Sequence, residues 1–421
     1  MRDALIFLLI FATIPAILMR PYIGALTWAW LSFMNPHRLS WGAAHNFPFA
    51  QIIGIVTLVS MLFSSEKKRV PITNVTIVWL LFIVWMNVTY IYALIPELAE
   101  TEWQRVMKIQ FFSFVTIMLL PGRDRINYVV AIIVASIAFW AVKGGLFAIS
   151  TGGSGRVFGP AGSFIEDNNG LGLAVVIVLP LMVYVMSQLQ KRWMRMAMLG
   201  VIGLSVLAIL TTQSRGAFLA VSATVAYIWS RSKRKALFGA IVLIAAPIFF
   251  FSMPQQWHDR MNTISTYEED GSAMGRINAW YFAWNLAVDR PLVGGGYGAF
   301  EPELFKKFAP QPEDYHDAHS IYFEMLGEHG FVGLGLFLLL GLLTFRTAGK
   351  VVKMTHGDEE REWANALGRA LQASLVAYAT GGLFLGLAYW DLYYHLIVIT
   401  VLLRDHLEVR ATLPGTEAKT V

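Results

Sequence analysis

The stretch NNGLGLAVVIVLPLMVYVMS, from Asn168 to Ser187, decides the fold class because it contains no charged side chain. The hydrocarbon core of a bilayer is about 30 Å thick, and a helix of about 20 mainly apolar residues spans it. Inside the bilayer no water pairs with peptide groups, so such a run folds as a helix, which pairs them internally. The stretch therefore predicts a transmembrane helix.

The composition extends this prediction to the whole chain. Of the 421 residues, 56% are hydrophobic and only 14% are charged, whereas charged residues make up about a quarter of a soluble globular domain. We expect an all-α, polytopic integral membrane protein with about 12 transmembrane helices. The chain contains no cysteine, which excludes thiolate zinc sites, a catalytic cysteine and disulfides.

Apolar segments between charged breaks predict the individual spans. One long hydrophilic segment, residues 253–319, separates the helices of residues 1–252 from the helices and tail of residues 320–421, and we expect it to form a loop with short helices. The spans lie near residues 47–63, 72–94, 104–120, 126–150, 168–187, 195–212, 216–230, 236–252, 320–345, 365–388 and 391–403.

The N-terminal segment leaves two arrangements open. Ala4 to Met19 is as apolar as a signal peptide, but no small-residue cleavage site follows, so we interpret it as a retained anchor. Residues 4–34 form either one long bent span or two short segments broken at Arg20 and Pro21. Parity with the basic loops favours one crossing, and a second crossing would move the N-terminus to the outer side.

Basic residues in alternate loops predict the orientation, because cytoplasmic loops carry an excess of lysine and arginine. We place these loops and the C-terminal tail, with Arg404 and Arg410, in the cytoplasm, and residues 35–46 outside. The clusters are Lys67, Lys68 and Arg69; Arg123 and Arg125; Lys191, Arg192 and Arg195; Arg231, Lys233, Arg234 and Lys235; and Arg346, Lys350 and Lys353.

Other basic residues fall on the outer side or in the outer part of a span. A positive charge at membrane depth is costly and usually has a function. An anionic ligand on the outer face would explain several of them. They are Arg20, Arg38, Arg105, Lys108, Lys143, Arg156, Arg215, Arg260, Arg276, Arg290, Lys306 and Lys307.

Two of these arginines occur in informative patterns. Residues 272–289 read as a helix on which Arg276, Trp280 and Trp284 share a face, where a guanidinium can grip a phosphate and the indoles can stack on sugars. An interfacial aromatic belt explains that face equally well. Arg215 follows Thr-Gln-Ser in a short outer turn, as a phosphate clamp or a snorkelling anchor.

The outer loop at residues 162–169 contains polar side chains suited to sugar hydroxyls, although turn formation explains them almost as well. They are Glu166, Asp167, Asn168 and Asn169.

His319 lies where the long loop meets the next span, a position suited to a general base. Asp317, Glu324 and Glu328 are all candidates for the carboxylate that orients it, and a purely structural histidine is an equal alternative.

Other chemistries fit this region less well. A metal site that uses His316 and His319 lacks a recognised ligand pattern. A serine hydrolase would need a Gly-x-Ser-x-Gly motif around Ser214 or Ser320, and neither serine has one. The run from Gly294 to Gly298 does not continue as a phosphate-binding loop, and we interpret it as a flexible turn.

Taken together, these motifs resemble the O-antigen ligase and polymerase superfamily. The similarity rests on Gln213-Ser214-Arg215-Gly216, Gly275-Arg276 with Trp280, and His319-Ser320-x-Tyr322 at the end of one long loop. Arg20-Pro21-Tyr22-Ile23-Gly24 and Met34-Asn35-Pro36-His37-Arg38-Leu39 look closest to the O-glycosylation ligase branch associated with exosortase-type systems. The family often has asparagine where this chain has Ser320.

The resemblance implies a metal-independent glycosyltransferase of the bacterial inner membrane with a periplasmic active site, no cofactor and no nucleic-acid partner. Its donor would be a glycan on undecaprenyl diphosphate, and its expected acceptor is a hydroxyl of the lipid A-core oligosaccharide. Arg215 and Arg276 would bind the diphosphate, and His319 would act as the base. Further candidate substrate-binding residues are Arg105, Lys108, Lys143, Arg156, Asn168, Trp280 and Tyr322.

Two alternatives stay open. An O-antigen polymerase or a protein O-oligosaccharyltransferase would use the same donor with another acceptor. A transporter of a lipid-linked anion is the alternative from another class, although the sequence shows no internal repeat of the kind that transporters have.

Overall fold

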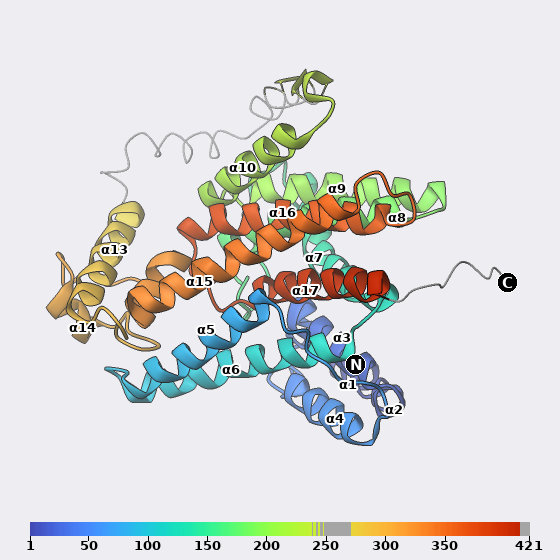
Figure 1. Ribbon diagram of the computed structural model, residues 1–421. Coiled ribbons are helices and arrows are strands. Elements are labelled where there is room, and N and C mark those ends of the chain that lie inside the picture. Colours follow the sequence, from blue (N-terminus) through green and yellow to red (C-terminus); the bar gives the residue numbers. More distant parts are fainter. Residues whose placement is uncertain (238, 241–242, 245–246, 248–270, 413–421) are drawn as a thin grey trace.

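The computed structural model describes residues 1–237, 239–240, 243–244, 247 and 271–412. Most of the predicted span 236–252, Arg260 and residues 253–270 of the long loop lie outside the described residues. The described part is helical and contains no strand, which confirms the all-α prediction (Figure 1). Its helices are α1 (Arg2–Phe11), α2 (Ile14–Met19), α3 (Pro21–Met34), η1 (Pro36–Leu39), α4 (Phe49–Phe63), α5 (Asn74–Ile91), α6 (Pro96–Leu119), α7 (Arg123–Ser150), α8 (Asn168–Gln188), α9 (Arg192–Thr211), α10 (Arg215–Arg231), α13 (Gly271–Asp289), α14 (Pro302–Phe308), α15 (Ile321–Met354), α16 (Glu362–Gly381), η3 (Gly382–Phe384) and α17 (Asp391–Thr412).

Several helices are suited to a bilayer. In the described part of the chain, six are long and apolar enough to cross a membrane by length and composition. They are Arg2–Met19, Asn74–Ile91, Arg123–Ser150, Asn168–Gln188, Arg192–Thr211 and Ile321–Met354, and Phe49–Phe63 is a shorter apolar helix. These helices indicate a membrane protein. The total of about 12 spans stays a prediction.

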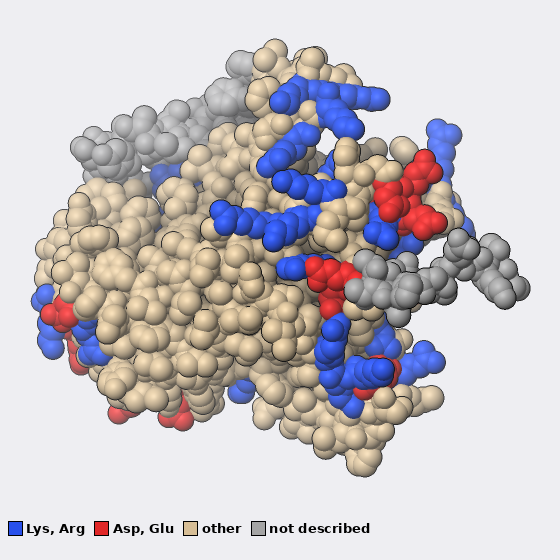
Figure 2. Space-filling view, viewed as in Figure 1, with Lys and Arg blue, Asp and Glu red and all other residues tan. Residues whose placement is uncertain are grey.

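Contacts between loops bring predicted cytoplasmic clusters to one end of the bundle. Arg69 pairs with Asp405 of α17, and Arg125 pairs with Glu66 at 2.7 Å. The Arg123 guanidinium lies 5.1 Å from the Trp363 ring at the start of α16. Figure 2 shows many lysine and arginine side chains toward this end and a broad uncharged surface beside them. The loops at residues 64–69 and 120–125 therefore share one end, as the alternation of basic loops predicts.

The N-terminal segment folds back on itself. Asp3 accepts a hydrogen bond from the Ala44 N–H at 3.2 Å, so the N-terminus lies beside the segment that follows α3. At the opposite end of α4, Ser60 donates to the Ile17 carbonyl at 2.6 Å. The chain reverses at Arg20, which has extended backbone, and Pro21 begins α3. Residues 4–34 therefore form two legs broken at Arg20 and Pro21, and the number of times that they cross the membrane stays a prediction.

The predicted span 365–388 is also interrupted. Helix α16 ends at Gly381, and η3 and an extended segment connect it to α17. Added Cβ atoms at Gly381 and Gly382 would lie only 2.2 Å from Leu173 and 2.4 Å from Ile321. These glycines let the chain approach α8 and α15 closely. Hydropathy did not reveal this break because its residues are apolar.

Helix α15 contains a second interruption, at Gly330, where φ is 67°. The N–H of Phe331 bonds to Pro291 instead of its own helix, and Gly295 donates to the Gly327 carbonyl at 2.8 Å. Gly298 donates to the Glu328 carboxylate at 2.8 Å. The glycine run at residues 294–298 is thus a turn that is fixed to α15, and its interpretation as a flexible turn is wrong.

Two hydrophobic cores result from this arrangement. The main core fills the helix bundle. A smaller core joins α13, α14 and the chain before α15, and in it Phe282 stacks on Phe305 with ring centroids 4.2 Å apart. We call α13, α14 and residues 290–320 the lobe.

Candidate active site

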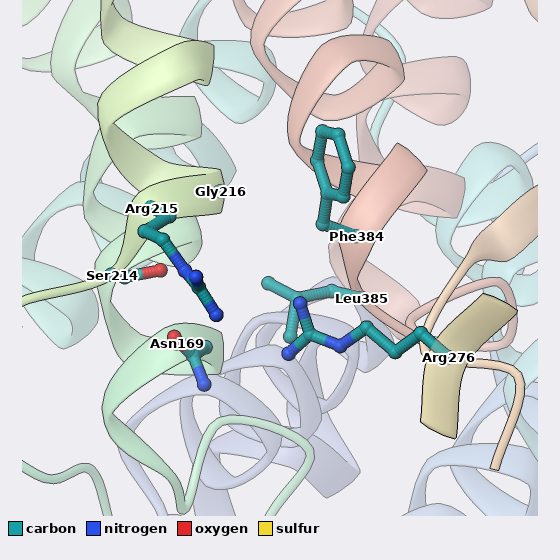
Figure 3. A pocket seen from close by; sticks show the side chains of 7 residues that line it. All are labelled: Asn169, Ser214, Arg215, Gly216, Arg276, Phe384 and Leu385. Atoms are coloured by element: carbon teal, nitrogen blue, oxygen red, sulfur yellow. The ribbon is translucent and has the colours of Figure 1, made fainter. Parts of the chain in front are cut away.

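One pocket lies between the bundle and the lobe, and it contains two of the arginines selected from the sequence. Figure 3 shows the side chains of Arg215 and Arg276 extending into it from opposite walls. Its lining residues are Asn169, Ser214, Arg215, Gly216, Arg276, Phe384 and Leu385.

The Arg215 wall is built from the ends of three helices. Arg215 is the first residue of α10, and the Ser214 hydroxyl caps that helix by accepting from the Ala217 N–H at 3.2 Å. Asn168, at the start of α8, donates to the Thr212 carbonyl at 2.7 Å and so holds the turn before α10. Because α10 also packs against α8 and α16, the position of Arg215 is set by the bundle.

The Arg276 wall belongs to the lobe. Trp280, one turn along α13, donates through its indole N–H to the Ala318 carbonyl at 2.9 Å. Its ring stacks on Phe323 at 4.9 Å between centroids. Ala318 directly precedes His319 in the chain. Trp280 therefore fastens the helix of Arg276 to the segment that carries the predicted base.

Two further contacts join α13 to the same segment. Asn278 donates to the carbonyls of Gln311 and Asp314 at 2.8 and 2.7 Å, and its own carbonyl accepts from the Gln311 N–H at 2.9 Å. A Cβ at Gly275 would lie 2.4 Å from the His316 ring. The absence of a side chain at residue 275 thus allows α13 to lie directly against this segment.

His319 has the electrostatic surroundings of a neutral base. It is half-buried and takes the left-handed backbone conformation, with φ of 41°. Burial and, next, the positive charge of Arg276 lower the pKa of His319 below its ordinary value, while the carboxylates of Asp317 and Asp167 oppose this shift. A lowered pKa leaves the imidazole neutral at pH 7, in the form that accepts a proton.

The structure narrows the choice of carboxylate around His319. Glu328 accepts from the Gly298 N–H and from the Tyr389 hydroxyl, and Glu324 accepts from the Ala388 N–H at 3.3 Å. These two glutamates thus face the segment before α17. Asp317 and Asp167 are the carboxylates whose charges act on His319.

Other residues selected from the sequence lie outside the pocket lining. Asn168 holds the turn behind it, and the Tyr322 hydroxyl donates to the Ala379 carbonyl at 2.7 Å, which ties α15 to the end of α16. The remaining candidates are exposed cations on α6, on α7 and in the loop before α8: Arg105, Lys108, Lys143 and Arg156.

The metal site considered as an alternative would need a cluster of ligating side chains, and the described residues do not form one. His316 pairs with Asp314 at 2.8 Å. Within the ranges that the structure describes, no group of three or more His, Asp or Glu side chains is arranged to hold a metal ion.

The pocket also contains residues that sequence reasoning missed. Phe384 and Leu385 form its wall at the break between α16 and α17. Gly216 lies against this wall, since its Cβ would be 3.4 Å from that of Phe384. The glycines at residues 381, 382 and 386 were the available signal, because such a group inside an apolar run favours a break.

Comparison with known families agrees with the motifs. Residues 1–190 match a family described as a family of unknown function (DUF5935). Residues 200–338, which include Arg215, Arg276 and His319, match the family described as O-Antigen ligase. No curated protein matches the chain. Residues 200–338 of this chain are therefore an O-antigen ligase family domain.

Proposed function

We propose that the chain is a glycosyltransferase that moves a glycan from undecaprenyl diphosphate to a hydroxyl of the lipid A-core oligosaccharide. The O-antigen ligase family domain supports a ligase or polymerase activity of the glycosyltransferase type. The observation that carries the proposal is the convergence of Arg215 and Arg276 on one pocket, with His319 close enough for Arg276 to lower its pKa. The active site faces the periplasm, and the protein lies in the inner membrane.

The two arginines suit the donor. When the bond between the anomeric carbon and the diphosphate oxygen breaks, its electron pair stays on the diphosphate. Guanidinium groups match phosphate oxygens with paired N–H donors and keep their charge at every relevant pH. Arg215 and Arg276 therefore stabilise the leaving group as its charge grows, the task that a metal ion performs in many other transferases.

His319 suits the acceptor. The attacking hydroxyl oxygen forms the new glycosidic bond and loses its proton to the neutral imidazole. Because Arg276 acts on His319 electrostatically, the group that holds the diphosphate also keeps the base ready to accept a proton. Asn169 and the Phe384–Leu385 wall line the space between the two arginines and contact the transferred sugar.

The decisive experiment is transfer by the purified full-length chain. Undecaprenyl-diphosphate glycan and rough lipopolysaccharide are mixed with the protein in the presence of a chelator, and the mass gained by the acceptor is measured. The wild-type chain transfers, whereas His319→Ala and Arg276→Ala do not, although both remain folded in detergent.

Other results would redirect the proposal. Retained turnover in His319→Ala would remove the base assignment. Activity that is lost with chelator and restored by one divalent ion would introduce a metal. Transfer only to a glycan end or to a protein would identify a polymerase or a protein O-oligosaccharyltransferase. A folded wild-type chain inactive with every acceptor would refute glycosyl transfer and favour transport.

A further inference from the structure

A second cationic site lies outside the pocket, on the turn at residues 159–166. The turn leads directly into Asn169, which lines the pocket. It is compact, because the Gly162 N–H donates to the Glu166 carboxylate at 2.8 Å and the Gly159 N–H donates to the Glu166 carbonyl at 2.9 Å. Two arginines from distant parts of the chain pack on this turn.

Arg38, in η1, packs on the glycine of the turn. Its guanidinium carbon lies 3.0 Å from where a Cβ of Gly162 would be. One terminal nitrogen donates to the Asn46 side chain at 3.0 Å, while the buried Nε has no hydrogen-bond partner within the described part of the chain. A buried guanidinium N–H is costly to leave unpaired. Nε of Arg38 is therefore a donor that the described residues leave unsatisfied.

Arg105, on α6, also packs on the turn. Its guanidinium carbon lies 3.8 Å from the centre of the Phe164 ring. Its ion pair with Glu102 is long, at 3.6 Å, and about half of each side chain is exposed. Exposed pairs of this kind are weak, so Glu102 compensates the charge of Arg105 only slightly.

A neutral, half-buried histidine precedes Arg38 in the chain. Burial, followed by the charges of Arg38 and His45, lowers the pKa of His37 to about 4. His37 is therefore neutral at pH 7, and its buried Nδ1 has no hydrogen-bond partner in the described residues. The site therefore combines two guanidiniums with two unsatisfied ring or guanidinium nitrogens on neighbouring residues.

We propose that Arg38 and Arg105 form a second anion-binding site, which holds a phosphate group of the acceptor glycolipid while the diphosphate of the donor occupies the pocket. Planar guanidinium forks suit phosphate oxygens. The turn connects the two sites, so a bound acceptor is held beside the Asn169 wall. This inference rests on the proposed function, because it identifies how that reaction binds its second substrate.

The test compares the wild-type chain with an Arg38→Gln/Arg105→Gln double variant. Transfer is measured at saturating donor with rough lipopolysaccharide and with the same acceptor after chemical removal of its phosphates. In the double variant, the KM for the phosphorylated acceptor rises about fivefold or more, as expected when hydrogen bonds to a charged group are lost. With the dephosphorylated acceptor, the two proteins have the same KM.

A charge-matched control is Lys306→Gln/Lys307→Gln, which removes two exposed cations from α14. It leaves both KM values unchanged. An unchanged acceptor KM in the arginine double variant would overturn the proposal, and so would an equal rise for both acceptors. A fall in kcat or a rise in donor KM alone would also overturn it, because it would mean that the arginines only brace the turn.

A bilayer headgroup is the other source of phosphate. The kinetic comparison is therefore repeated in phosphatidylcholine vesicles with and without phosphatidylglycerol. If the effect of the double variant follows phosphatidylglycerol and not the acceptor phosphates, the acceptor assignment is wrong.

A binding measurement without donor distinguishes failure of this inference from failure of the proposed function. Binding of rough lipopolysaccharide to the wild type and the double variant is measured in detergent without donor. If the wild type performs no transfer, a phosphate-dependent loss of binding in the variant still supports the site. Equal binding refutes the site whether or not the protein transfers.

Discussion

The two walls of the pocket differ in how they hold their arginines. Arg215 begins a helix whose first residues belong to the main core, in which Ala217 and Ala220 are fully buried. Arg276 lies on α13, which packs through its own small core and is tied to residues 311–318 by Asn278 and Trp280. One arginine is therefore positioned by the bundle, and the other by polar contacts within the lobe. The proposed donor binding requires both to be in place, and we expect the lobe to be the side whose position can change without unfolding the bundle.

The largest expected effect comes from the arginines themselves. Arg215→Lys and Arg276→Lys each lower kcat by about 100-fold, because an ammonium keeps the charge but loses the planar pair of donors. Steady-state transfer measures this loss. The double variant is less damaging than the product of the two single effects if both arginines hold one diphosphate. Full activity in Arg215→Lys would instead identify a snorkelling anchor.

Two asparagine variants, one in each wall of the pocket, test whether the bundle and the lobe differ in stability. Asn168→Ala leaves the buried Thr212 carbonyl without its side-chain donor, which costs about 1–3 kcal/mol and lowers the Tm of the whole protein. Asn278→Ala loosens only the lobe, so hydrogen exchange accelerates in residues 311–320 while the Tm changes less. Thermal unfolding and hydrogen exchange measured by mass spectrometry give the two readouts. Equal Tm losses would show that the lobe and the bundle unfold as one unit.

A variant of Trp280 tests the hydrogen bond between α13 and the segment before His319. Trp280→Phe keeps an aromatic ring to stack on Phe323 but loses the donor to Ala318, and kcat falls about fivefold, as for one hydrogen bond of about 1 kcal/mol. Trp229→Phe is the matched control, because it removes an indole hydrogen bond to Lys235 at the opposite end of α10. An equal loss in both variants would contradict a specific role for Trp280.

The smallest effect is a shift in pH dependence. The Asp317 carboxylate raises the pKa of His319, so Asp317→Asn lowers that pKa further. Activity depends on the neutral imidazole and falls as the pH drops through its pKa, so the acidic limb of kcat/KM moves to lower pH in this variant. The profile is measured against Glu313→Gln as a control in the same loop. A shift to higher pH would show that His319 is not the titrating base.

Much of the candidate site was accessible from the sequence because charge is costly at membrane depth. Arg215, Arg276 and His319 stand out as polar groups beside apolar runs, whatever their partners are. Phe384 and Leu385 have no such signal, since apolar residues in an apolar run look the same whether they face lipid or a pocket. The role of Trp280 was hidden for a similar reason, because an indole face predicts stacking but not the carbonyl that its N–H meets.

The topology was likewise predictable from the sequence in part and decided by tertiary contacts in part. Alternating basic loops predict which connections share an end, and the pairs of Arg69 with Asp405 and Arg125 with Glu66 agree with this. Parity does not predict the reversal at Arg20, since it counts crossings and contains no information on whether a broken helix bends or reverses. That choice depends on contacts with residues far along the chain, such as those of Asp3 with Ala44 and Ser60 with Ile17.

The sequence by itself determined that this protein is helical and suited to a membrane, and which of its charged residues are exceptional. Both follow from local properties: the length of apolar runs and the cost of charge beside them. Only the tertiary structure decided that Arg215 and Arg276 share a pocket, that the turn at residues 159–166 packs against Arg38 and Arg105, and that the glycine run at residues 294–298 is fixed to α15. These features join residues far apart in the chain, and the packing of helices and the pairing of buried peptide groups bring them together.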